Sequence, residues 1–156
     1  MPDNPATSAE NRVVTASRAI AAPAAVIFEL IADPARHADW DGNGNIAEAA
    51  EGQRVRAVGD RFRTRLTGDS GVRVNHVVEF DEGHRIAWQP AMEDAPPFGQ
   101  LWRWEVDPAP DGGATVTHTY DWTRLEDPTR LERARSTSAA MLRASLDRLA
   151  TLAEQS

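Results

Sequence analysis

Residues 101–122 read LWRWEVDPAPDGGATVTHTYDW, and their pattern decides the fold class. Apolar and polar side chains alternate on both sides of residues 108–113, which are rich in the proline and glycine typical of a turn. Two strands joined in this way form a hairpin with one apolar face and one polar face. The facing pairs predicted on the apolar side are Val106 with Val116, Trp104 with His118, and Trp102 with Tyr120.

Three further segments show the same two-residue period, with the even-numbered side chains again forming the more apolar face. These segments cover residues 61–66, 72–81 and 85–89, and turn residues separate them at 68–71 and 82–84. The second turn places Asp81 opposite Arg85, which is a favourable pair on the polar face. One apolar and one polar face indicate an antiparallel sheet that covers a core on one side only.

Short helices are predicted between the first strand and the remaining ones. A strand over Arg12–Ile20 precedes a helix that begins at Pro23, because proline suits the first helical position. Asp33 is expected to end this helix and to cap a second, shorter one that starts at Pro34.

The C-terminal part predicts one long helix from Pro128 to Glu154, capped by Asp127. At 1.5 Å per residue it would be about 40 Å long, enough to cross the apolar face of the sheet. The fold class is therefore α+β, with a single domain over residues 12–156 after a flexible tail at residues 1–11. The stripe expected to face the sheet comprises Leu131, Ala134, Ser138, Met141, Leu142, Ser145, Leu149 and Leu152.

Composition narrows the classes of partner. The formal net charge is −7, which argues against a nucleic-acid backbone as the main partner. No apolar run approaches the roughly 20 residues that span a bilayer, so membrane insertion is not expected. The first ten residues lack the order of a signal peptide, and the chain has no cysteine. A cytoplasmic location is therefore expected.

The predicted inward face combines large aromatic side chains with a few polar ones, the usual make-up of a small-molecule pocket. The helix opposite carries only small side chains at residues 136–140, which would leave room for a ligand. We expect a cup for a small, largely apolar molecule; the alternative is a filled core of ordinary density. The predicted ligand-binding residues are Thr64, His76, Trp88, Trp102, Trp104, His118, Tyr120, Trp122, Ser138, Met141 and Leu142.

Catalysis in this cup would depend on titratable side chains. His118, His76 and Tyr120 are the best candidates, because an unperturbed histidine titrates near neutral pH. The alternative is that each histidine is neutral and hydrogen-bonded within the core. His37 and His84 are expected at solvent-exposed positions. The histidines are scattered and cysteine is absent, so neither a metal site nor a cofactor is predicted.

Two other patterns have plain structural explanations. Residues 39–50 match part of a calcium-binding EF-hand loop, but Ala50 stands where the bidentate glutamate is needed. Turn formation explains this segment better. The side chains of Arg61, Arg63, Arg65 and Arg73 are expected on the polar face. Either an anionic partner or the nearby acidic side chains of Glu79 and Asp81 would accompany them, and we favour the second.

Short sequence motifs make the fold assignment more specific. The run from Ile20 to Trp40, IAAPAAVIFELIADPARHADW, resembles the opening of the polyketide cyclase/dehydrase and lipid-transport family within the START-like SRPBCC superfamily. Residues 58–62 (VGDRF), and residues 102–106 (WRWEV) followed by 112–116 (GGATV), are also similar to that family. The resemblance covers about residues 12–154.

The resemblance implies a helix-grip fold, in which a curved sheet wraps around a long C-terminal helix. It also implies a cavity for lipids, polyketides or other apolar molecules. Some members of the family catalyse cyclisation or dehydration, whereas others bind or carry a ligand. Three hypotheses follow: a binding protein, a cyclase or dehydratase acting in the same cavity, and an interaction scaffold with a filled core. A monomer or homodimer is expected.

Overall fold

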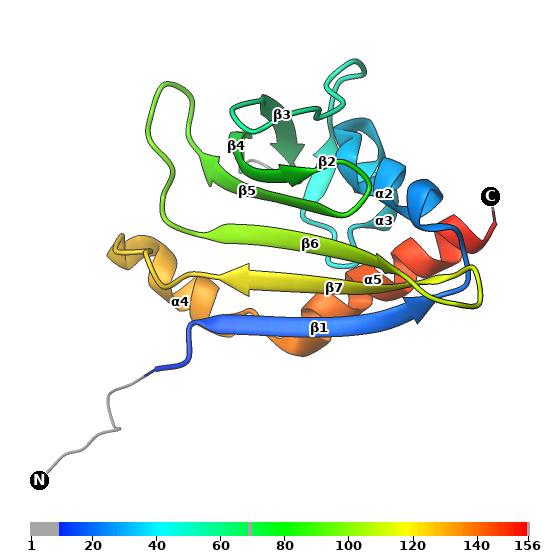
Figure 1. Cartoon of the computed structure of the whole chain (residues 1–156). Helices are drawn as coiled ribbons and strands as arrows, with labels where there is room; N and C mark the ends of the chain where they lie inside the picture. The colour runs from blue at the N-terminus through cyan, green and yellow to red at the C-terminus, as the bar shows by residue number, and fades with distance from the viewer. Residues whose placement is uncertain (1–9, 69, 156) are drawn as a thin grey trace, which may run out of the picture.

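The computed structural model describes residues 10–68 and 70–155, and it consists of one curved sheet with helices on one side (Figure 1). All neighbouring strands are antiparallel, in the order β1-β7-β6-β5-β4-β3-β2. The strands are β1 (Val13–Ile20), β2 (Ile46–Glu48), β3 (Arg61–Leu66), β4 (Val72–Asp81), β5 (Arg85–Ala91), β6 (Leu101–Pro108) and β7 (Ala114–Asp121). The predicted α+β helix-grip fold is confirmed, although the predicted tail lies mostly outside the described residues.

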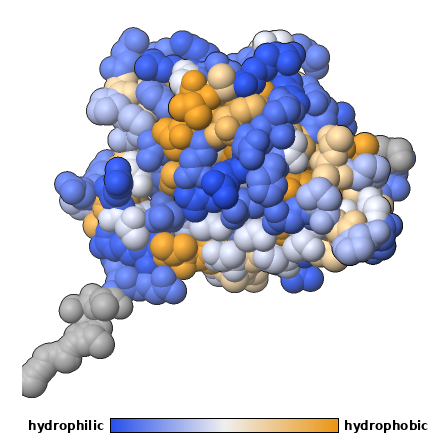
Figure 2. All heavy atoms as spheres, in the orientation of Figure 1, coloured by the Kyte–Doolittle hydropathy of each residue, from blue (hydrophilic) through white to orange (hydrophobic). Residues whose placement is uncertain are grey.

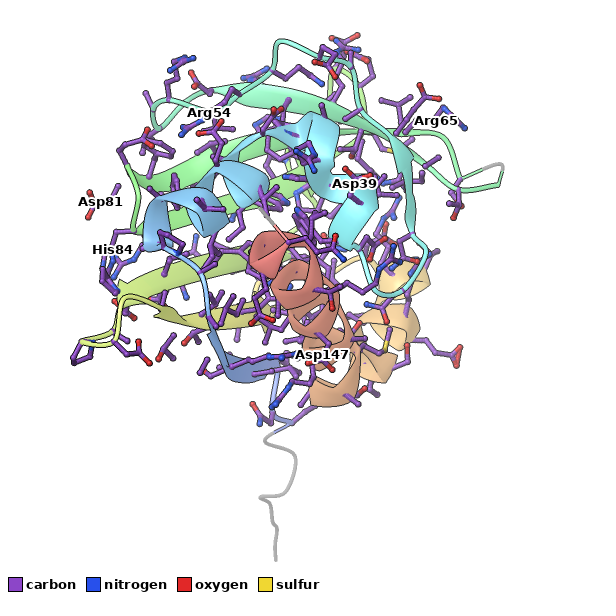
Figure 3. The ribbon with its side chains drawn as sticks, turned by 90° about the vertical axis from the view of Figure 1, so that its right-hand side faces the viewer. Asp39, Arg54, Arg65, Asp81, His84 and Asp147 are labelled. Carbon is purple, nitrogen blue, oxygen red and sulfur yellow. The ribbon has the colours of Figure 1, made fainter. Side chains whose placement is uncertain are left out.

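The helices between β1 and β2 begin and end close to the positions predicted from the sequence. Pro23 is the cap of the first helix rather than its first residue, and the Asp33 side chain caps the next turn by accepting a hydrogen bond from the Ala35 N–H. These elements are α2 (Ala24–Ala32), the 3₁₀ turn η1 (Pro34–Arg36) and α3 (His37–Trp40). Arg54 ties α2 to the β4–β5 turn, since its Nη2 lies 2.8 Å from carboxylate oxygens of Glu29 and Glu82 (Figure 3).

The predicted single C-terminal helix is wrong, because the chain forms two helices there. These are α4 (Pro128–Ser136) and α5 (Ala139–Glu154), and Figure 1 shows α4 at one end of β7 while α5 runs behind β1 and β7. Thr137 is extended, and the Ser138 side chain caps α5 by accepting a hydrogen bond from the Met141 N–H. Serine and threonine favour such caps over helix interiors, so the small residues that suggested room for a ligand instead break the helix.

Strand registers on the β5–β7 side agree with the predictions. All three facing pairs of the β6–β7 hairpin are present, and Asp81 faces Arg85 across the β4–β5 turn. This side of the sheet packs against α2 and α5, which supply Ile27, Phe28, Ile31, Leu146 and Leu149 to the main core.

Strand β4 contradicts the simple alternation. A β-bulge between Val77 and Glu79 shifts its register against β5. As a result, Val77 pairs with Trp88 and Asn75 pairs with Phe62, which places Val77, Asn75 and Arg73 on the inner face. The predictions that His76 faces inward and that Arg73 faces outward are therefore wrong. One extra residue in β4 reverses the face to which each preceding side chain of the strand points.

The outer surface is mainly polar. The face in Figure 2 is largely hydrophilic, with smaller hydrophobic areas between the polar ones. Val72 and Val78, which the bulge leaves outside the core, are 41% and 38% exposed. Among the described residues, none of the helices has the length and apolar character needed to cross a membrane.

Candidate functional site

A cavity of about 410 Å³ lies between the inner face of the sheet and helices α3, α4 and α5. Its volume falls within the range of roughly 300–1,000 Å³ that is typical of small-molecule sites. The lining changes along the cavity from buried aromatic side chains to more exposed, positively charged ones. We call the first group the deep wall (His37, Trp40, Trp88, Trp104 and His118) and the second the rim (Arg73, Phe98, Arg130 and Arg133).

His118 lies at the centre of the deep wall, stacked between two tryptophans. Its ring centroid is 3.6 Å from that of Trp104 and 5.5 Å from that of Trp102. The His118 Nδ1 is 3.1 Å from the carbonyl oxygen of Arg103, and because a carbonyl only accepts, Nδ1 carries the proton and donates it. Burial lowers the pKa of His118 to about 3, so the ring is neutral near pH 7 with a free lone pair on Nε2.

His37 is the second buried histidine, and the prediction that it is solvent-exposed is wrong. It is 1% exposed and stacks on Trp88 with ring centroids 5.2 Å apart. Its Nε2 donates to the carbonyl oxygen of Ile31 at 2.7 Å. Burial lowers the pKa of His37 to about 4 despite this hydrogen bond and the nearby acidic charges of Asp33 and Asp41.

His84, in contrast, is half-buried at the β4–β5 turn and does not line the cavity. Its Nδ1 lies 2.8 Å from the carbonyl oxygen of Val106.

Tyr120 extends the aromatic wall toward the rim. Its ring centroid lies 4.2 Å from that of Trp102. Burial raises the pKa of Tyr120 to about 12, against the opposing effects of the Gln100 side chain and the charge of Arg133. Two buried polar atoms of this wall, the Nε1 of Trp104 and the Oε1 of Gln100, have no hydrogen-bond partner among the described residues.

The loop after α3 closes one side of the cavity, and its structure confirms the predicted turn. The Asp41 carboxylate is buried and accepts hydrogen bonds from the backbone N–H groups of Asn43, Asn45 and Ile46, at 3.1, 2.6 and 2.9 Å. Asp41, Asn43 and Asn45 all line the cavity. No cluster of three potential metal-ligating side chains occurs in residues 10–68 and 70–155.

The rim gathers three guanidinium groups, two of which lie over the same aromatic ring. Arg130 lies over Phe98 at 3.6 Å from the ring centroid, and Arg73 lies 5.7 Å from the same centroid. Partial burial, followed by the charges of Arg130 and Arg133, lowers the pKa of Arg73. Like charges have therefore been brought together at this end of the cavity.

Most of the predicted site residues meet in this cavity. Thr64, Trp88, Trp102, Trp104, His118, Tyr120, Met141 and Leu142 line it.

Three other predicted site residues do not line the cavity. The β4 bulge turns His76 to the opposite face, where it borders a separate hollow with Arg61 and Arg63. Trp122 lies past the end of β7, packed beneath the guanidinium groups of Arg12 and Arg135. Ser138 is occupied as the cap of α5.

Sequence reasoning missed several lining residues, for identifiable reasons. His37 and Trp40 are three residues apart in a helical segment and so share one face, a spacing that could have revealed their common burial. Arg73 and Asn75 were hidden by the bulge, whose one local mark is the adjacent pair Val77–Val78.

Two of the arginines predicted to lie on the outer face have acidic partners, as expected, but the partners are not the residues that were predicted. Arg63 pairs with Glu93, and Arg65 pairs with Glu48. Neither partner is the Glu79 or Asp81 expected from the sequence; Glu79 instead pairs with Arg103 at 2.7 Å.

Comparison with known proteins identifies the class to which this fold and cavity belong. Residues 11–154 match the family described as polyketide cyclase/dehydrase and lipid transport. The chain is therefore a member of that family, as the sequence resemblance predicted.

One curated relative is the uncharacterized protein Rv0088 of Mycobacterium tuberculosis, 31% identical over 111 residues. The match covers 70% of this chain and 47% of the relative, so the chain spans about half the length of the curated relatives it matches.

Solved structures share the fold at lower identity. Protein CV1439 from Chromobacterium violaceum has a TM-score of 0.65 at 20% identity, over 92% of this chain and 97% of that one. A solution structure from Thermobifida fusca has a TM-score of 0.65 at 23% identity, covering 93% and 95%. The major latex-like protein 151 of Panax ginseng has a TM-score of 0.58 at 16% identity, covering 90% and 96%.

Proposed function

We propose that the protein binds a small, largely apolar or aromatic molecule, lipid-like or polyketide-like, in the cavity between the sheet and helices α4 and α5. The observation that carries the proposal is the cavity itself: about 410 Å³ bordered by aromatic side chains. A scaffold with a filled core would have no such space. Family membership supports the proposal, because the family description includes lipid transport. A cytoplasmic location is part of the same proposal.

The chemistry of the three candidate catalytic side chains favours binding over catalysis. A general acid or base works best when its pKa lies near the operating pH. The pKa of His118 is about 3 and that of Tyr120 about 12, so neither exchanges protons readily near pH 7. His76 lies on the other face of the sheet. A cyclase or dehydratase remains the second hypothesis, and it would have to rely on positioning.

Polar atoms of the wall suggest how a ligand would be oriented. Because His118 Nδ1 is engaged by the Arg103 carbonyl, its Nε2 is available only as an acceptor. We therefore expect a hydroxyl of the ligand, rather than a carbonyl, to bond to His118.

Intrinsic fluorescence tests the proposal directly, since Trp88, Trp102 and Trp104 line the cavity. Titration with a panel of fatty acids, fatty alcohols and polycyclic aromatic compounds should quench or shift the emission, with saturation. Trp122→Phe is the matched control, because Trp122 lies outside the cavity and its loss should leave the ligand-induced change intact. An emission that no compound alters would contradict the proposal.

His118→Phe separates orientation from simple burial. Phenylalanine keeps a flat ring between Trp102 and Trp104 but removes the Nε2 acceptor. Binding of 1-naphthol should weaken about tenfold, the effect of one lost hydrogen bond of about 1.4 kcal/mol, while binding of naphthalene should stay within about twofold. Equal weakening of both compounds would mean that His118 only shapes the wall.

A further inference from the structure

The rim holds more positive charge than the described residues around it balance. Among the described residues, Arg73 donates only to the backbone carbonyls of Ser70 and Val72, and Arg133 donates to the side-chain oxygen of Asn45. Within residues 10–68 and 70–155, no carboxylate lies within ion-pair distance of either guanidinium. This is unexpected in a chain with a formal net charge of −7.

Arg130 adds a third, incompletely satisfied cation. Its Nε is buried and has no hydrogen-bond partner among the described residues, although a carboxylate oxygen of Asp127 lies 3.4 Å away. That oxygen is within ion-pair distance but lacks hydrogen-bond geometry, and the Asp127 carboxylate already accepts from Thr129. The stacking of Arg130 on Phe98 fixes its plane at the cavity lining.

Arginines on the opposite face of the sheet are arranged differently. Arg63, Arg65 and Arg103 each pair with a glutamate. Arg73 and Arg133 therefore differ from these three arginines in having no carboxylate partner among the described residues. They come from two elements far apart in sequence, β4 and α4, and converge on one cavity.

We propose that the rim binds the oxyanion head group of a ligand whose apolar body occupies the cavity. The inference rests on the proposed function and narrows it from apolar molecules to amphipathic acids, with a carboxylate, phosphate or sulfonate at one end. Guanidinium groups suit such head groups because their paired N–H donors match two oxygens at once. The apolar body would lie against Trp102 and Tyr120, and the charge beside Arg73 and Arg133.

Two dyes that differ only in a sulfonate group provide the probe. 1-Anilinonaphthalene-8-sulfonate carries a sulfonate, and N-phenyl-1-naphthylamine is the same ring system without it. Dissociation constants for both are measured by dye fluorescence in the full chain, at constant ionic strength. A parallel titration in sodium sulfate instead of sodium chloride separates a head-group site from a site for free inorganic anions.

The decisive variant is Arg73→Gln/Arg133→Gln. Its matched control is Arg56→Gln/Arg124→Gln, which removes two exposed arginines that lie outside the cavity lining and changes the net charge equally. The rim variant should bind the sulfonate dye at least tenfold more weakly and the neutral dye within twofold of the wild type. The control variant should bind both dyes like the wild type. The single variant Arg133→Gln, at an exposed position, should show the same trend with a smaller change.

Three results would overturn the proposal. In the first, the rim variant loses affinity for both dyes equally. In the second, the control variant binds the sulfonate dye as weakly as the rim variant does. Displacement of the sulfonate dye by millimolar sulfate alone is the third, and would indicate a free-anion site. If neither dye binds the wild type, both the proposed function and this inference are rejected. If only the neutral dye binds, the proposed function stands and only the oxyanion site at the rim is rejected.

Discussion

The deep wall and the rim of the cavity treat polar groups in opposite ways. In the deep wall, His37 and His118 are almost fully buried, and each donates to a backbone carbonyl while remaining neutral. At the rim, Arg73 and Arg133 are charged and more exposed, with no carboxylate partner in the described parts of the chain. The difference teaches that the two buried histidines are neutral and hydrogen-bonded without a ligand, whereas Arg73 and Arg133 have no carboxylate partner among the described residues.

The largest effect is expected from acidification, which acts on the deep wall. Burial lowers the pKa values of His37 and His118 from their usual 6.5 to about 4 and about 3, so below pH 6.5 the unfolded chain binds protons that the folded chain does not. Stability is therefore retained above pH 6.5 and falls as the pH drops toward 4. From pH 7 to pH 5 the loss should be about 4 kcal/mol, or about 2 for each histidine.

Urea denaturation across this pH range measures that loss. Among the acidic groups, Asp33 and Asp41 act on His37 and slightly oppose the effect, whereas no charged group acts on His118. The His118→Phe variant should therefore lose about half of the pH dependence between pH 7 and 5. An unchanged slope in that variant would show that His118 is not neutral and buried in the folded state.

The Asp41 loop, which joins the two regions, should show the next largest effect. Asp41→Ala leaves three backbone N–H groups without their acceptor, so the free energy of unfolding should fall by about 3 kcal/mol. Asp41→Asn keeps one side-chain oxygen and should cost less than half of that. Chemical denaturation of both variants measures the difference, and equal losses would argue against the hydrogen bonds as the cause.

Removing one wall hydrogen bond should cost less again. In His118→Phe at pH 7, the Arg103 carbonyl loses its partner while the stacking with Trp104 is kept. A destabilisation of about 1 kcal/mol is expected, measured by thermal or chemical unfolding. A loss above about 3 kcal/mol would mean that the position requires the imidazole itself for packing.

Replacing the rim arginines should change the free energy of unfolding very little in the same assay. Replacing Arg73 and Arg133 by glutamine removes like charges that oppose one another, and it breaks no ion pair among the described residues. The free energy of unfolding should therefore stay within about 0.5 kcal/mol of the wild type, or rise slightly. A marked destabilisation would show that the rim is structural, and would erase its contrast with the deep wall.

The sequence predicts the β6–β7 half of the site well and the β3–β4 half poorly. Strict alternation and a proline-glycine turn determine the positions of Trp102, Trp104, His118 and Tyr120, so residue parity alone locates them. In β4 the same rule fails, because a bulge adds one residue whose one local mark is the adjacent pair Val77–Val78.

The composition of β4 also contributed to the wrong assignment of its inner face. Val72, Val74 and Val78 form an apolar row on the outer face, so a pattern based on hydrophobicity selects the wrong side. The helix break had a visible cause, since residues 136–138 are serine and threonine, but a shared apolar stripe on both sides of the break concealed it.

The pairing of β1 with β7 has a consequence for how the chain acquires its structure. Ser17 and Thr117 face each other across this pair although 100 residues separate them. Within this sheet, β1 is the first strand to be synthesised and β7 the last, so β1 gains its neighbour only after the whole sheet has been synthesised. Such non-local closure slows folding, so β1 is expected to gain amide protection late in pulse-labelled refolding experiments, after the β6–β7 hairpin.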